Sequence, residues 1–315
     1  MPLRELTGVF HLCVSKNLRR LTVDMASYCS FEQAVVRMKE HHGVDLNASL
    51  VRKITLQAGE AAAEILDAEV EKPISERSGM LIMQMDGVMV PVTSSMKSSD
   101  RRKTKTVQYQ EMKVGIIRKP EAIESLSACS FEGADLLGKR LGKLLSELGG
   151  DASTKVHGLG DGALWIPEQG EQIAGCNYSH LIDFYHFAEY LYDAFEGDLR
   201  RDLKVSRSKQ EAKAGQMSKV MRRLYRRAKE HPDHEGVKAC ISYIKNRANQ
   251  FKYAEAIAKE LPIGSGEVES ANRSLIQQRL KLPGCWWLRE NASKIACLRV
   301  VRANNGWNKL WARAA

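Results

Sequence analysis

Three carboxylates in this chain of 315 residues stand where acidic side chains can do chemistry. Asp86 follows an apolar run and precedes a glycine, and Asp161 stands between two glycines after a second apolar run. Acids beside glycine at the ends of strands lie at the edge of a sheet, where backbone and ligand approach closely. Glu269 lies in the first turn of a helix expected after a Gly-Ser-Gly sequence. The three acids could therefore meet at one end of a sheet.

Three carboxylates at one place repel each other, so such a cluster is typical of a site that holds cations. Mg²⁺ prefers oxygen ligands and keeps part of its coordination shell for water and substrate phosphates. Two such ions, Mg²⁺ or Mn²⁺, can assist attack on a phosphodiester and stabilise the leaving oxygen. The pattern therefore predicts a two-ion site for phosphoryl transfer.

Each acid, taken alone, also fits an ordinary structural role. The Asp86-Gly87 pair is a common hairpin turn, and Asp161 would suit a turn or a helix cap. Glu269 would be a first-turn acid that the helix dipole favours, and Glu267 competes with it for any role in an active site. The interpretation as a site depends on the combination of the acids with a basic chain.

The chain is basic, and the excess of positive charge is uneven. It contains 48 Lys and Arg against 38 Asp and Glu, a net charge of +10. Residues 200–229 hold twelve basic and two acidic residues, and residues 270–315 hold nine basic residues and one acid. Concentrated basic faces suggest a polyanionic partner, most simply nucleic acid, although any single run also fits a solvated helix face.

Other classes of protein are disfavoured. No apolar run reaches the roughly 18 residues of a membrane span, and the N-terminus lacks the pattern of a secretory signal. The seven cysteines are odd in number and widely spaced, without a CxxC pair. This argues against a disulfide framework and a zinc ribbon. We expect a cytoplasmic protein with no membrane partner.

The elements that would position the acids are predicted from hydrophobic periodicity. Five strands are expected, two of them in a hairpin that turns at Asp86-Gly87, with helices before, between and after them. This order predicts a mixed α/β sheet with helices packed on it. The strands are expected within 80–92 (the hairpin), 106–118, 154–159 and 180–184, and the main helices over 131–148, 187–260, 267–280 and the C-terminal segment to 311.

The N-terminal part is predicted to be helical and to contain a helix-turn-helix. Ser30 is expected to cap one helix, and Asn47 or Ser49 the next. Arg52 and Lys53 stand near the start of the second helix, where they would reach DNA bases. Any helical hairpin would show a similar pattern.

Five short motifs follow one another between about residues 80 and 310. They are Met85-Asp86-Gly87 with Val90-Pro91-Val92; Gln110-Glu111-Met112-Lys113-Val114; Gly160-Asp161-Gly162-Ala163-Leu164-Trp165-Ile166; Leu181-Ile182-Asp183-Phe184-Tyr185-His186; and Ile263-Gly264-Ser265-Gly266-Glu267-Val268-Glu269-Ser270, followed by Arg279-Leu280-Lys281 and Trp286. In this order they resemble bacterial insertion-sequence transposases of the DDE type, in the Kra-like group related to eukaryotic Mutator-type transposases.

The resemblance implies a ribonuclease-H-like mixed sheet core, a large all-helical insertion, and flanking N- and C-terminal helices. It makes Asp86, Asp161 and Glu269 the metal-binding triad, and it places the family's Asp-x-x-His element on Asp183 and His186. A helix start at which His186 bonds to Asp183, without chemistry, remains the alternative. The implied segments are an N-terminal helical region with the helix-turn-helix (1–78), the first part of the core (79–186), a basic helical insertion (187–262), and the final core helix with C-terminal helices (263–315).

The function implied by the resemblance is metal-dependent DNA cleavage and strand transfer, in which water and then a DNA 3′-hydroxyl attack phosphodiesters in line. The alternatives are a silent or domesticated DNA-binding protein derived from such a transposase, and a metal-dependent nuclease of the same fold. The implied partners are double-stranded DNA and further copies of the chain, as a homodimer or higher oligomer at the bacterial nucleoid. Phosphate contacts are expected from basic side chains of a loop, the insertion and the C-terminal part: Arg101, Arg102, Lys103, Arg222, Arg223, Arg226, Arg227, Arg279 and Lys281.

Two features depart from the family pattern. Only some 78 residues precede the core, whereas the family often has a longer region there. Residues 283–287 read Pro-Gly-Cys-Trp-Trp, where the family usually has Gly-Met, a basic residue and Trp. The first departure leaves open how the ends of an element would be recognised and whether the copy is truncated.

Overall fold

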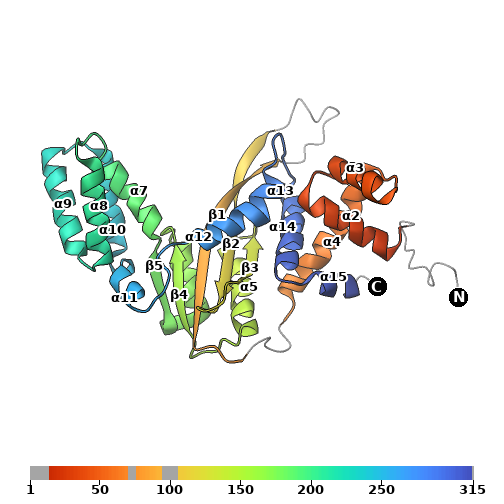
Figure 1. Cartoon of the computed structure of the whole chain (residues 1–315), viewed down its shortest axis with the longest axis horizontal. Coiled ribbons are helices and arrows are strands. Elements are labelled where there is room, and N and C mark those ends of the chain that lie inside the picture. The colour runs from red at the N-terminus through yellow and green to blue at the C-terminus, as the bar shows by residue number, and fades with distance from the viewer. Residues whose placement is uncertain (1–13, 70–75, 94–105, 314–315) are drawn as a thin grey trace.

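A computed structural model describes residues 14–69, 76–93 and 106–313. Its centre is a five-stranded mixed sheet with the strand order β3-β2-β1-β4-β5 (Figure 1). β1 pairs antiparallel with β2, which pairs antiparallel with β3, and β1, β4 and β5 run parallel. The expected mixed α/β class is confirmed. The strands are β1 (Met80–Thr93), β2 (Val107–Arg118), β3 (Leu126–Ser130), β4 (Lys155–Gly160) and β5 (Tyr178–Ile182).

β1 is one continuous strand, so the hairpin expected at Asp86-Gly87 is wrong. Asp86 pairs with Val114 and Gly87 pairs with Lys113, both on β2. A Cβ on Gly87 would lie 1.9 Å from Oε1 of Glu111. The glycine therefore admits a neighbouring side chain against the strand and does not turn the chain.

The side chains of β1 alternate between two helical layers, as strand geometry requires. Leu81, Met83 and Met85 pack in one core with helices α5 (Ala134–Glu147) and α6 (Trp165–Ala174). On the other face of β1, Val88, Val90 and Val92 pack against a second layer that contains the C-terminal helices. Asp86 faces this second layer, because it lies two residues before Val88.

Helices extend the molecule on both sides of the sheet (Figure 1). The insertion lies beyond β5 and shares a core with it, since Leu181 and Ile182 pack with Phe187 and Leu224. The boundary expected at residue 187 falls inside helix α7. The insertion comprises α7 (Phe184–Ala194), α8 (Arg201–Lys213), α9 (Met217–Glu230), α10 (Glu235–Asn246), a 3₁₀ turn (Ala248–Gln250) and α11 (Tyr253–Ala258); a 3₁₀ turn (Gly175–Asn177) precedes β5.

The chain after the insertion returns across the sheet. Helix α12 continues through a π-helical turn, η3, into α13, and these elements contact β1 and β2. Helix α14 then packs beside β3 and against the N-terminal helix α4. The bounds are α12 (Gly266–Ala271), η3 (Asn272–Gln277), α13 (Gln278–Leu280), α14 (Arg289–Ala303) and α15 (Trp307–Arg313), with the N-terminal helices α2 (Lys16–Tyr28), α3 (Phe31–His42) and α4 (Ala48–Asp67).

The expected helix caps of the N-terminal part are confirmed. The Ser30 hydroxyl accepts a hydrogen bond from the backbone N–H of Gln33, and Asn47 rather than Ser49 caps α4 by accepting from the N–H of Leu50 at 2.8 Å. Helix α4 also packs against α14 so closely that a Cβ on Gly59 would lie 2.5 Å from the carbonyl oxygen of Lys294. The N-terminal helices are therefore part of the body of the molecule.

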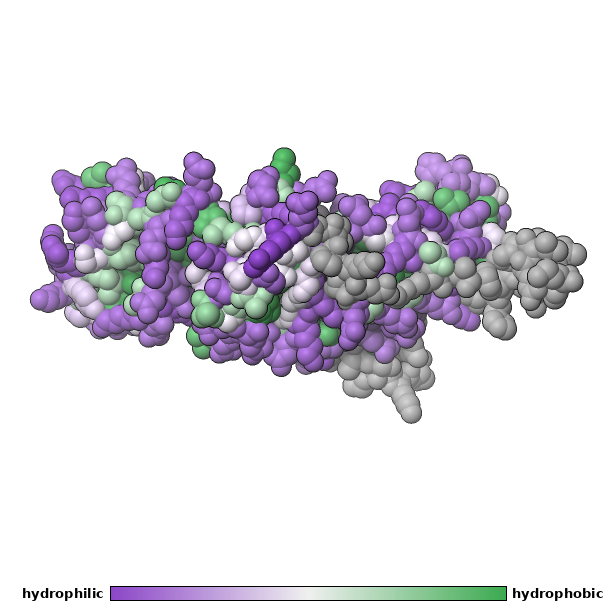
Figure 2. Space-filling model, turned by 90° about the horizontal axis from the view of Figure 1, so that it is seen from below, coloured by the Kyte–Doolittle hydropathy of each residue, from purple (hydrophilic) through white to green (hydrophobic). Residues whose placement is uncertain are grey.

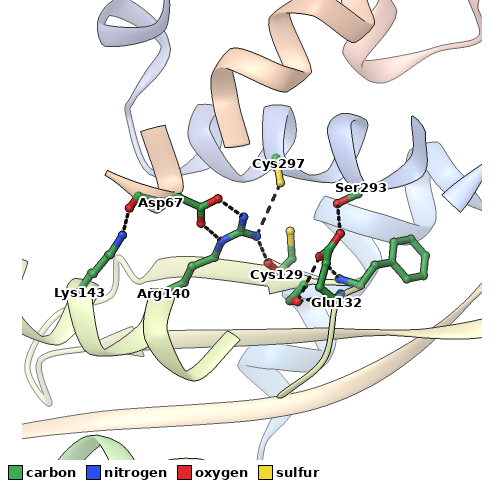
Figure 3. Close-up of polar contacts among 9 residues, drawn as sticks. Asp67, Cys129, Glu132, Arg140, Lys143, Ser293 and Cys297 are labelled. Atoms are coloured by element: carbon green, nitrogen blue, oxygen red, sulfur yellow. Dashed lines mark hydrogen bonds and ion pairs between the residues drawn. The ribbon is translucent and has the colours of Figure 1, made fainter. Parts of the chain in front are cut away.

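A buried arginine connects four of these elements (Figure 3). Arg140 of α5 donates to both carboxylate oxygens of Asp67 at the end of α4, at 2.8 and 3.1 Å. The same guanidinium donates to the carbonyl oxygen of Cys129 on β3 and contacts the sulfur of Cys297 on α14 at 3.8 Å. This network fixes α4 and α14 on the sheet, beside the elements that carry the acids.

The surface seen in Figure 2 is mainly hydrophilic, with hydrophobic residues scattered over it. Across the described ranges, no helix combines the length and apolarity that crossing a bilayer requires. The six cysteines of these ranges are all free thiols.

Candidate carboxylate site

Asp86 and Asp161 lie at matching positions on two neighbouring parallel strands, Asp161 just after the end of β4 and Asp86 inside the longer β1. The last pair between β1 and β4 joins Gln84 to Leu159, and each acid stands two residues beyond its member of this pair. Because side chains alternate along a strand, both acids face the layer of α12. The carboxylate of Asp161 accepts a hydrogen bond from the backbone N–H of Ala163 at 2.9 Å.

Helix α12 brings Glu269 to these two acids. Its position is fixed by two polar contacts with β1. The backbone N–H of Val268 donates to Oε1 of the buried Gln84 at 3.1 Å, and the amide of Asn272 donates to Oδ2 of Asp86 at 2.6 Å. Glu269 stands between these two contact residues on the helix, and its side chain is exposed.

The pKa of Asp86 reports on this proximity. The pKa of Asp86 is raised from 3.8 to about 6, mainly by burial and in smaller part by the negative charges of Asp161 and Glu269. Hydrogen bonds from the backbone of Gly87 and from Asn272 act in the opposite direction. Asp161 and Glu269 therefore lie near enough to Asp86 for their charges to oppose its ionisation.

The two glutamates of α12 have different surroundings. Glu267 forms a bidentate ion pair with Arg118 at the end of β2, with both nitrogen–oxygen distances at 2.7 Å. This pair occupies both oxygens of Glu267. Glu269, by contrast, contributes its charge to Asp86. The geometry therefore favours Glu269 over Glu267 as the third acid.

Asp183 is buried, with 2 % of its surface exposed, and both of its carboxylate oxygens are occupied. One oxygen accepts from the backbone N–H of His186 at 2.7 Å and so caps α7. The other accepts from the hydroxyl of Ser265 at 2.6 Å and from its backbone N–H. Asp183 thus joins the start of α7 to the turn that precedes α12.

The bond expected between His186 and Asp183 exists, and it runs through the backbone of His186. The imidazole points elsewhere, with its Nδ1 3.2 Å from a carboxylate oxygen of Glu189. Its ring meets the rings of Tyr190 and Tyr243 edge to face, with centroid distances of 5.5 and 6.1 Å. His186 therefore belongs to an aromatic cluster between α7 and α10.

Several basic residues expected to bind DNA are exposed. Arg52 and Lys53 lie on the outer side of α4, Arg222 and Arg226 on α9, and Lys281 just after α13. Arg101, Arg102 and Lys103 lie outside the described residues. The exposed members leave their guanidinium and ammonium groups accessible to a polyanion.

The guanidinium groups of three other arginines bind partners within the chain, which corrects the expectation that these residues bind phosphates. Arg223 donates to both oxygens of Glu211 at 2.8 Å. Arg227 is buried against Asp198 and the carbonyls of Ala194 and Glu196. Arg279 is 1 % exposed and lies 4.9 Å from the rings of both Phe31 and Trp287, with its Nε bonded to a carbonyl of α2.

Several residues that shape the site were not identified from the sequence. Gln84 precedes Asp86 by two residues and so lies on the same face of β1. Asn272 follows Glu269 by three residues and so lies on the same side of the helix. These spacings are the signals that would have found them. Arg118, Tyr243 and Arg247 come from distant parts of the chain and carry no such signal.

Carboxylate oxygens from neighbouring strands and a helix suit a hard divalent cation such as Mg²⁺ or Mn²⁺. Within the ranges that the structure covers, no three His, Cys, Asp or Glu side chains converge closely enough to form a metal-coordinating set. Burial, and to a smaller extent the charges of Asp161 and Glu269, raise the pKa of Asp86. Neither a scan against models of protein families nor a search of curated proteins found a match to this chain.

Proposed function

We propose that the chain is a DDE-type DNA transposase, a metal-dependent enzyme that cuts DNA and transfers the ends of an insertion sequence. One observation carries the proposal. Asp86 and Asp161 stand at equivalent places on adjacent parallel strands, and the charges of Asp161 and Glu269 both act on Asp86. A mixed sheet with acids just beyond the last residue pair of two parallel strands is compatible with a ribonuclease-H-like core, which belongs to the same proposal.

Asp86, Asp161 and Glu269 would hold the cations. When bound there, Mg²⁺ or Mn²⁺ supplies neutralisation of the charge that builds up on a phosphodiester during in-line attack. Asn272 orients the Asp86 carboxylate, and Gln84 holds α12 against β1. With a pKa of about 6, Asp86 is ionised at pH 7.5 and available as a ligand.

The distribution of positive charge supports DNA as the substrate. The insertion carries the basic segment, and Arg222 and Arg226 of α9 are exposed there. Arg52 and Lys53 present charge on α4, in the N-terminal part of the molecule. Contacts of this kind position DNA through its phosphates without reading its sequence.

The test is incubation of the purified chain with a plasmid that carries the DNA flanking its gene, with Mg²⁺ or Mn²⁺. Asp161→Asn is compared with wild type and with Asp233→Asn, which removes the same charge from an exposed turn of the insertion. We expect nicks at both element ends and joined products with wild type and Asp233→Asn, and none with Asp161→Asn.

Other outcomes would favour the alternatives. DNA binding without any cut would indicate a silent or domesticated DNA-binding protein. Metal-dependent cuts without joined products would indicate a nuclease of the same fold. Cleavage by Asp161→Asn at the wild-type rate would show that the carboxylates are not the site.

A further inference from the structure

The helical insertion holds the turn that carries Asp161. The hydroxyl of Tyr243, on α10, donates a hydrogen bond to the main-chain carbonyl of Asp161 at 2.7 Å. Arg247, directly after α10, donates from Nε to the carbonyl of the next residue, Gly162, at 2.8 Å. The carbonyls of two consecutive residues, Asp161 and Gly162, are therefore bound by side chains that lie more than 80 residues later in the sequence.

The turn and the insertion are fitted to each other. Gly162 has a φ of +91°, which disfavours any other residue. A Cβ on Gly162 would lie 2.8 Å from Nε of Arg247 and 2.9 Å from the hydroxyl of Tyr243. A side chain there would thus displace the same two groups that bind the carbonyls. The sequence Gly160-Asp161-Gly162 is explained in part by this contact.

The two donors are themselves held in place. The guanidinium of Arg247 lies 4.5 Å from the centre of the Tyr243 ring. The ring of Tyr190 on α7 stacks on the ring of Tyr243, with a centroid distance of 4.0 Å. Tyr243 is buried in the core that the insertion shares with β4 and β5. A hydrogen-bond donor fixed by such packing can set the orientation of the peptide that it binds.

We propose that Tyr243 and Arg247 are positioning residues for the reaction, through which the insertion sets the direction of the Asp161 carboxylate. The inference rests on the proposed function, in which Asp161 is a metal ligand. The insertion then has a role besides DNA contact, because side chains on and directly after α10 hold the turn that carries Asp161. The hydrogen bonds to the carbonyls of Asp161 and Gly162 fix the backbone that carries the Asp161 side chain against α10.

The test uses the full chain and three variants. Tyr243→Phe removes only the hydroxyl and keeps the ring in its stack, and Arg247→Met removes the second donor and keeps most of the aliphatic side chain. Tyr253→Phe is the matched control, because Tyr253 lies in the same buried aromatic cluster and its hydroxyl has no partner within the described residues. Thermal unfolding confirms that each variant is folded at the assay temperature.

Two readouts separate positioning from general structural damage. We expect Tyr243→Phe and Arg247→Met to lower kcat for plasmid nicking by about 10-fold, the effect of one misplaced group in a site. KM for DNA should stay within about twofold, and the Mn²⁺ concentration for half-maximal nicking should rise severalfold. Tyr253→Phe should match wild type in all three quantities. The same result for Tyr243→Phe and Tyr253→Phe would overturn the inference, as would a change confined to KM.

Direct titration of Mn²⁺ into the proteins by calorimetry distinguishes failure of the inference from failure of the proposed function. If Asp161→Asn binds Mn²⁺ as wild type does, the metal site is not where we place it and both proposals fail. If Asp161→Asn loses Mn²⁺ while Tyr243→Phe and Arg247→Met bind it with wild-type affinity and cut at the wild-type rate, only the inference fails.

Discussion

The carboxylate of Asp183 and the hydroxyl of Ser265 are hydrogen bonded at 2.6 Å, which joins the first turn of α7 to the start of α12. The backbone N–H of Ser265 binds the same oxygen. Ser265 stands four residues before Glu269, so this contact decides where the third acid of the site lies. Asp183, which the resemblance placed in an Asp-x-x-His element, thus positions the helix that carries Glu269.

Asp183→Asn is expected to destabilise the protein and to impair cleavage. An asparagine amide cannot accept from both His186 and Ser265, so at least one buried donor loses its partner. We expect the free energy of unfolding to fall by about 1–3 kcal/mol, measured by urea denaturation. Ser265→Ala should cost less, about 1 kcal/mol, because the backbone bond to Asp183 remains. Equal stability of Asp183→Asn and wild type would contradict this account of α12.

The two glutamates of α12 are expected to differ sharply. Glu269→Gln should abolish plasmid nicking without loss of stability, because it removes a charge that repels Asp86. Glu267→Gln should leave measurable nicking and lower the free energy of unfolding by about 1 kcal/mol, since it breaks a partly exposed bidentate pair with Arg118. Nicking rates and urea denaturation of both variants provide the check. The reverse pattern would make Glu267 the third acid.

Asp86 gives the metal-free protein a specific pH dependence. The pKa of Asp86 is about 6 in the folded state, against 3.8 for a free aspartate as in the unfolded chain. The folded state therefore holds the proton more tightly. The stability from this group is fully present below pH 4 and is lost as the pH rises through 6. Asp86→Asn should therefore be more stable than wild type at pH 7.5 by about 1–2 kcal/mol, after allowance for solvent screening, and equal to it near pH 4.

The measurement is thermal unfolding in EDTA at the two pH values, followed by repetition with Mn²⁺ at pH 7.5. Added Mn²⁺ should raise the Tm of wild type, because a ligand that binds only the folded state stabilises it. It should not raise the Tm of Asp86→Asn. A wild-type Tm that is the same in EDTA and in excess Mn²⁺ would count against a metal site at Asp86.

Arg140 is expected to matter for stability and not for chemistry. Arg140→Met leaves the carbonyl of Cys129 and the carboxylate of Asp67 without their donors, and we expect a loss of about 2–3 kcal/mol in the free energy of unfolding. Lys139→Met is the control, because Lys139 is the exposed neighbour on the same helix. Below the melting transition Arg140→Met should nick DNA at the wild-type rate. A loss of nicking in the folded variant would show that the α4–α14 layer affects the acids.

Local signals in the sequence predicted much of the fold. Ser30 and Asn47 are caps because a side-chain oxygen beside the first turn satisfies a free backbone N–H, which depends only on nearby residues. The strand over 154–159 and the helix over 131–148 follow from short-range periodicity, and both exist within a few residues of the expected bounds. The place of Asp161 after a strand was predicted in the same way.

What could not be predicted depends on contacts between distant segments. Asp86-Gly87 has the composition of a turn, but pairing with Val114 and Lys113 of β2 keeps it in a strand. The short strand β3 and helix α6 were missed, because a strand of five residues that includes two serines and a helix of ten residues give a weak periodic signal. The pairing of Arg223 with Glu211 and the burial of Arg279 are likewise set by packing, so charge counts overstate the positive charge that the surface exposes.

The most direct test of the account is calorimetric titration of Mn²⁺ into wild type and into three single variants, Asp86→Asn, Asp161→Asn and Glu269→Gln, at pH 7.5. If the three acids form one site, wild type binds two ions, and each variant loses at least one of them or binds at least about 10-fold more weakly. Asp233→Asn should bind as wild type does. Wild-type binding by all three variants, or no binding by wild type, would contradict the central claim that these carboxylates form a metal site.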